Sequence, residues 1–73
     1  MPKLPVLSGQ DIRRVLESHG FQLVRQRGSH MVMQKSTEDG TTTVPVPDHD
    51  ELRTGTLRSI IRQSGLEVGD FRK

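Results

Sequence analysis

The most constraining feature of this chain is a turn signal between two β-type runs. Asp39-Gly40 separates HMVMQK at 30–35 from TTTVPV at 41–46, and Asp-Gly between such runs strongly favours a tight hairpin. The chain has 73 residues, and a domain this small buries only about 60% of the surface that its unfolded chain exposes. We therefore expect one domain over residues 1–73, with a thin core and shallow surface sites.

Helical patterns flank the hairpin on both sides. Ser8 is a suitable N-cap with Asp11 three residues later, which is the spacing of a capping box, and Gly20 is placed to end the helix. TGTLRSIIRQSG at 54–65 predicts a second helix with Thr54 as its cap.

A further strand is predicted at 21–26, FQLVRQ, before the hairpin. Pro45 cannot donate to a sheet ladder, so its strand is expected at an edge. Alternation assigns Met31 and Met33 to the core and leaves His30 facing solvent on the opposite side. The predicted order is α-β-β-β-α, an α+β fold with a three-stranded antiparallel sheet and two helices on one face.

Composition excludes several classes of protein. There is no cysteine, so a disulfide framework and a thiolate metal site are excluded, and a reducing compartment is favoured. The loop PDHDE at 47–51 holds potential ligands, but adjacent residues rarely converge on one ion, so we predict no metal and no cofactor. No apolar run has the length of a membrane span or signal peptide. We expect a cytoplasmic protein without a membrane partner.

Charge is unevenly distributed along the sequence. Residues 36–52 contain several acids and neither Lys nor Arg, whereas two segments contain bases and no acid, with Arg25, Arg27 and Lys35 in the first and Arg53, Arg58 and Arg62 in the second. Basic segments that meet in space would suit a polyanion, most naturally nucleic acid. On charge alone, an ordinary well-solvated surface is the simpler explanation.

The segments SGQDIRRVLESHGF, RQRGSHMVM, TTVPVP and ELRTGTLRSIIRQSGL together resemble the HicA family of bacterial toxins, over most of the chain. The most specific parts are Gly28-Ser29-His30 at the start of a strand and the block GTLRSI at 55–60. The resemblance implies a fold similar to double-stranded-RNA-binding domains and endoribonuclease activity on messenger RNA. It also implies the toxin role in a type II toxin–antitoxin pair, with a cognate HicB-like antitoxin as partner, and His30 as the catalytic residue.

The chemistry of His30 is compatible with that role. RNA carries its own nucleophile, the 2′-hydroxyl, so a metal-independent nuclease needs only to move protons and to stabilise charge at phosphorus. An imidazole titrates near neutral pH, and general acid or base catalysis contributes about 10² to 10⁴ in rate. Arg25, Arg27 or Lys35 would stabilise the charge of the transition state. The alternative is a plain surface histidine. His19 lies on a helical stripe and is expected to pack, so no second acid or base is evident.

Other residues are candidate RNA contacts. Gly28 and Ser29 either approach phosphate or serve only as turn residues. Arg53, Thr56 and Arg58 surround the predicted start of the second helix, which is either a phosphate site or an ordinary helix end. His49, in the acidic loop, is assigned no role. The competing hypothesis is a non-catalytic RNA- or protein-binding module on the same fold, in which His30 has no special function.

Overall fold

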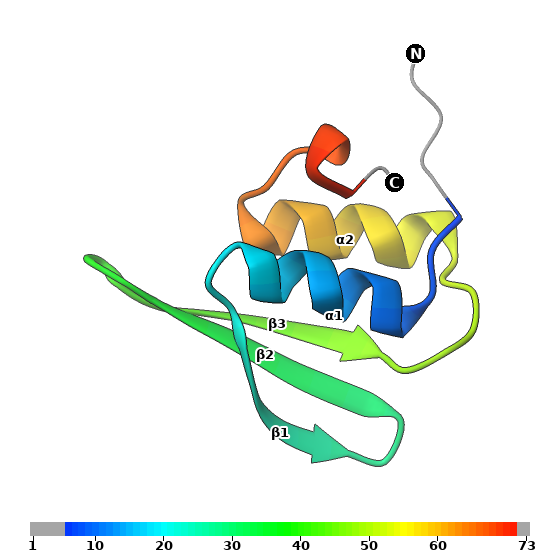
Figure 1. Cartoon of the computed structure of the whole chain (residues 1–73), viewed down its shortest axis with the longest axis horizontal. Helices are drawn as coiled ribbons and strands as arrows, with labels where there is room; N and C mark the ends of the chain where they lie inside the picture. The colour runs from blue at the N-terminus through cyan, green and yellow to red at the C-terminus, as the bar shows by residue number, and fades with distance from the viewer. Residues whose placement is uncertain (1–5, 72–73) are drawn as a thin grey trace.

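A computed structural model describes residues 6–71 and shows two helices on one face of a sheet (Figure 1). The elements are α1 (Gly9–Ser18), β1 (Gln22–Arg27), β2 (His30–Thr37), β3 (Gly40–Pro47), α2 (Thr54–Ser64) and a short 3-10 helix, η1 (Val68–Phe71). The strands are antiparallel and lie in the order β1-β2-β3. The predicted α-β-β-β-α fold is confirmed, and β3, which contains Pro45 and Pro47, lies at an edge.

Helix α1 has the predicted signals at both ends. The Ser8 hydroxyl accepts from the Asp11 N–H at 3.1 Å, and the Asp11 carboxylate accepts from the Ser8 N–H at 3.1 Å. After the helix, Gly20 adopts φ 94°, and the Phe21 N–H donates to the Leu16 carbonyl at 3.0 Å. This ending is a Schellman motif, and it directs Phe21 into the core.

The start of α2 differs from the prediction. Its N-cap is Arg53, and no side chain of residues 6–71 makes a capping hydrogen bond. The Arg53 carbonyl accepts the first helical bond, from the Leu57 N–H at 2.9 Å, which makes Thr54 the first helical residue. The prediction that Thr54 caps the helix is therefore wrong, and the first turn of α2 has no side-chain cap.

Two-residue turns join the strands. Gly28 and Ser29 connect β1 to β2, and only Gly28 of the two has positive φ, at 55°, as a type II′ turn requires. The second hairpin is also confirmed, but its loop is Glu38-Asp39, and Gly40 already pairs with Thr37 at the start of β3. Gly40, directly after this loop, has a positive φ of 129°.

The core lies between the helices and one face of the sheet. Met31 and Met33 are fully buried there, as predicted. The buried apolar side chains come from every element except β1, together with the segments between elements: Leu7, Ile12, Leu16, Phe21, Met31, Met33, Val44, Val46, Leu52, Leu57, Ile60, Ile61 and Phe71. The opposite sheet face is not covered by either helix (Figure 1). We call it the open face. In the part of the chain described, neither helix has the length and apolarity needed to cross a membrane.

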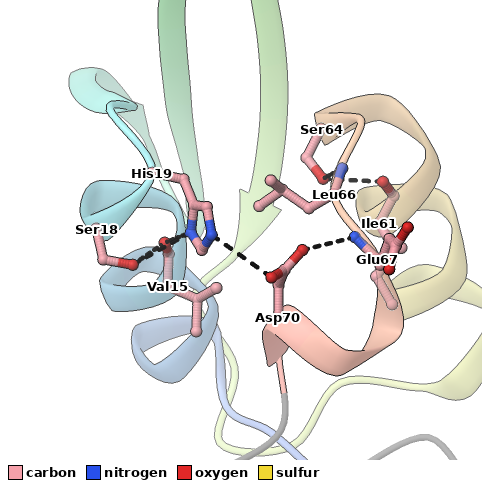
Figure 2. A network of polar contacts seen from close by, with 8 residues as sticks. All are labelled: Val15, Ser18, His19, Ile61, Ser64, Leu66, Glu67 and Asp70. Carbon is pink, nitrogen blue, oxygen red and sulfur yellow. Dashed lines mark hydrogen bonds and ion pairs between the residues drawn. The ribbon is translucent and has the colours of Figure 1, made fainter.

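A polar network joins η1 to α1 (Figure 2). His19 Nδ1 lies 2.9 Å from the Val15 carbonyl oxygen, and its Nε2 lies 3.7 Å from the Asp70 carboxylate. The other Asp70 oxygen accepts from the Glu67 N–H at 2.9 Å. His19 therefore makes structural contacts, in agreement with its place on the helical stripe.

Candidate functional site

His30 is the first residue of β2 and follows the Gly28-Ser29 turn directly. Its side chain is exposed, and alternation from the buried Met31 places it on the open face. In the sheet it pairs with Arg27 of β1 on one side and Pro47 of β3 on the other. The turn thus holds His30 at one end of the open face.

The His30 imidazole makes no hydrogen bond or ion pair with residues 6–71. No carboxylate or carbonyl group of this range orients the ring. Its two nitrogens are free to exchange protons with a bound molecule, and that molecule must supply the orientation.

A shallow depression of about 360 Å³ lies on the open face beside His30, lined by Val24, Arg25, Arg27, Val32 and Gln34. We call it the open-face hollow. A β-bulge between Leu23 and Arg25 leaves Val24 half-exposed at its rim, because a bulge places two residues opposite one. Arg25 and Arg27 are two residues apart on β1 and therefore share this face, and no acid lines the hollow.

A second depression, the loop-side hollow, has a volume of about 350 Å³ and is lined by Pro47, His49, Glu51, Leu52, Arg53 and Thr56. It brings Arg53 and Thr56 together at the start of α2. His30 lines neither hollow, but its β1 partner Arg27 lines the first and its β3 partner Pro47 lines the second. The two hollows therefore flank His30.

Two predicted RNA contacts, Lys35 and Arg58, belong neither to these hollows nor to the Gly28-Ser29 turn. Lys35 has the same alternation as Met31 and Met33, so it lies on the helix side, with Nζ 5.8 Å from the centre of the Phe21 ring. Lys35 therefore lies on the opposite sheet face from His30. Strict alternation along β2 was enough to predict this from the sequence. Arg58 is exposed on α2 and lines neither hollow.

Contacts between distant segments fix the surroundings of His30. The Asp48 N–H donates to the Ser29 carbonyl, and the Gly9 N–H donates to the His49 carbonyl at 2.8 Å. The Gln10 amide also donates to the Asp48 carboxylate at 3.1 Å. The β1–β2 turn, the start of α1 and the loop after β3 are thus held together, an arrangement that the sequence pattern did not reveal.

The acidic loop does not assemble into a metal centre. Within residues 6–71, no three side chains of His, Cys, Asp or Glu are grouped so that they could hold a metal ion. The groups around His30 include the guanidinium groups of both hollows and, in the loop-side hollow, the side chains of His49 and Glu51.

In a comparison with protein families, residues 9–66 match the family described as "HicA toxin of bacterial toxin-antitoxin". The matched range covers well over half of the 73 residues. It includes both helices, the sheet, the Gly28-Ser29-His30 turn and both hollows. A search of curated proteins found no match.

Proposed function

Because this chain belongs to the HicA toxin family of bacterial toxin–antitoxin systems, we propose that it is a metal-independent endoribonuclease that cleaves messenger RNA, with His30 as its general acid or base. The observation that carries this proposal is the position of His30. It is exposed, free of other partners within residues 6–71 and flanked by two hollows that contain arginine.

The proposed reaction is a transphosphorylation within the RNA. His30 takes the proton of a 2′-hydroxyl, the 2′-oxygen attacks the adjacent phosphorus, and the bond to the 5′-oxygen of the next nucleotide breaks. The 5′-oxygen leaves with a proton from water or from the imidazolium, which gives a 2′,3′-cyclic phosphate and a 5′-hydroxyl. One side chain at this position is worth about 10² to 10⁴ in rate.

The arginines supply the electrostatic part of the mechanism. Arg25 and Arg27 would stabilise the negative charge that grows on the phosphoryl oxygens, while Arg53, Thr56 and the uncapped first turn of α2 would hold a flanking phosphate. Gly28 and Ser29 would admit phosphate close to the turn, and Arg58 would contact RNA beyond the hollow. Lys35 faces the helix side and is left out of the proposed site.

The family also implies a protein partner. A toxin of a type II pair is neutralised by its cognate antitoxin, and we propose a HicB-like protein in that role. Because messenger RNA is the proposed substrate, the proposed place of action is the cytoplasm.

The first test compares wild type and His30→Ala on single-stranded RNA in EDTA. We expect wild type to produce 2′,3′-cyclic phosphate ends and His30→Ala to lose about 10² to 10⁴ in rate. Circular dichroism should be unchanged, because the His30 side chain is exposed and unbonded within residues 6–71. An RNA methylated at every 2′-oxygen serves as the uncleavable control.

Two other results would change the assignment. Cleavage by His30→Ala at the wild-type rate would show that another residue carries the reaction. Wild-type protein that binds RNA and leaves it intact would favour the non-catalytic binding module.

A further inference from the structure

We infer that the open-face hollow binds one unpaired nucleotide next to the scissile phosphate, and that Gln34 selects its base. This inference rests on the proposed ribonuclease function and adds to it a substrate class, single-stranded RNA, and a specificity residue. It is argued from the shape, the charge and the free polar groups of the open face.

The hollow extends along the strands away from His30. A neighbouring depression of about 240 Å³ is lined by Gly20, Gln22, Val24, Gln34 and Ser36, so Val24 and Gln34 belong to both. His30, Val32 and Gln34 alternate along β2 and share the open face. Gln34 is four residues from His30, roughly 13 Å along the strand at about 3.3 Å per residue. The depression therefore forms a continuous path that begins beside His30.

The lining is divided by chemistry along that path. Arg27 lies opposite His30, Arg25 lies opposite Val32 in the apolar middle, and the amides of Gln22 and Gln34 lie beyond them. No acid lines either depression. A phosphate beside the arginines, followed by a base on Val24 and Val32, matches this order. Charge complementarity thus favours a polyanion as the occupant.

Two amides lie where the base edge would fall. Gln22 and Gln34 are direct partners in the β1–β2 ladder, so their side chains project from neighbouring strands. Neither makes a side-chain hydrogen bond within residues 6–71. An amide presents both a donor and an acceptor, the combination used to read base edges. Gln34, which lines both depressions, is the better placed of the two.

The size of the hollow suits an unpaired nucleotide. A depression of about 360 Å³ accommodates a single base, whereas the bases of an A-form duplex are stacked and face a major groove too deep for side chains. Both phenylalanines are buried and the sequence has no Trp or Tyr, so the open face has no aromatic ring for stacking other than His30, and contacts to a long single strand would be weak. The specificity should therefore concentrate on one nucleotide.

The test uses oligonucleotides that contain one ribonucleotide linkage in an otherwise 2′-O-methylated strand. Each of the four bases is placed on either side of that linkage, and kcat/KM is measured for wild type, Gln34→Ala and Gln63→Ala. Gln63 is an exposed residue of α2 outside both hollows, so Gln63→Ala is the matched control. Circular dichroism confirms equal folding.

We expect wild type to prefer one base at one of the two positions, and Gln34→Ala to reduce that preference about tenfold while cleavage continues. Gln63→Ala should keep the preference, and annealing a complementary strand should suppress cleavage. If wild type cleaves without base preference, or Gln34→Ala keeps the wild-type preference, the inference is overturned while the nuclease function stands, and the open face serves another occupant such as a partner protein. If wild type cleaves none of the substrates, the proposed function itself fails.

Discussion

At the scale of single residues, Gly9 shows how closely two segments approach beside the candidate site. It is buried at the start of α1, and its N–H donates to the His49 carbonyl. A Cβ at this position would overlap the Pro47 carbonyl oxygen and lie 2.9 Å from the Asp48 Cα. Both obstacles belong to the backbone, which cannot rotate away as a flexible side chain could. Gly9 is therefore needed for space and not for its conformation.

Gly9→Ala should destabilise the protein although alanine is the better helix former. Helix propensity favours alanine by about 1 kcal/mol, but overpacking against backbone typically costs about 1–3 kcal/mol or more, so we expect a net loss. Urea denaturation of the variant measures it.

Gly55→Ala is the matched control, because it is also a helical glycine and a Cβ there meets nothing within 4 Å. It should be neutral or slightly stabilising. Equal stability of Gly9→Ala and wild type would contradict the close approach described above.

At the scale of elements, the β1–β2 turn determines where His30 lies. Gly28 adopts φ 55°, and a Cβ there would meet no atom within 4 Å. The fold therefore requires glycine here only for its positive φ. A separate question is whether the missing side chain also lets a phosphate group approach the turn. Substitutions can separate these two roles.

Gly28→Ala should lower the free energy of unfolding by about 1–2 kcal/mol, the cost of a Cβ in the left-handed region. Gly28→Asn should lose less, because asparagine is among the residues that occupy the positive-φ positions of type I′ and II′ turns. Thermal denaturation and RNA cleavage are measured on both variants. If glycine is only a turn residue, Gly28→Asn retains cleavage, whereas a stable but inactive Gly28→Asn would indicate that phosphate needs the space.

Local chemistry made most elements predictable. The Ser8–Asp11 capping box, Gly20, the turn at Gly28 and the alternation of Met31 and Met33 act within a few residues, and each was confirmed. The errors were shifts of one residue at the ends of elements. Arg53 replaced Thr54 as the N-cap because its carbonyl accepts the first helical bond, and the hairpin loop moved one residue towards the N-terminus because Gly40 entered β3.

The sequence indicated candidate residues for the site but not the surface depressions that they line. The sequence indicated His30 and the arginines, but the β-bulge next to Val24 and the packing of Gly9 against the loop after β3 depend on contacts between distant segments. For that reason the sequence did not reveal the open-face hollow or the role that we infer for Gln34. The assignment of Lys35 was the exception, because alternation alone places it on the helix side.

At the scale of the whole molecule, η1 completes the core. Phe71 is fully buried, although it lies beyond residues 9–66, the range matched to the family. The short helix is also tied to α1 through His19 and Asp70 (Figure 2). In a chain of 73 residues, one aromatic side chain is a large part of a thin core.

Phe71→Ala should cost about 3–5 kcal/mol, a large share of the roughly 4–11 kcal/mol expected for a domain of this size. Each kcal/mol lowers the melting temperature of such a domain by about 4–8 °C, so we expect a decrease of more than 10 °C in a thermal melt. Val6→Ala is the control, because Val6 is 72% exposed and its loss should change stability by at most about 0.5 kcal/mol. A Phe71→Ala variant that melts with wild type would show that η1 is dispensable.

The two prolines of β3 affect whether separate molecules of the protein can aggregate. Among the described residues the strand pairs only with β2, on one side, and Pro45 and Pro47 offer no N–H along its other side. Free strand edges are the places where sheets of separate molecules join into aggregates. The prolines therefore discourage polymerisation through β3 when the protein accumulates to high concentration.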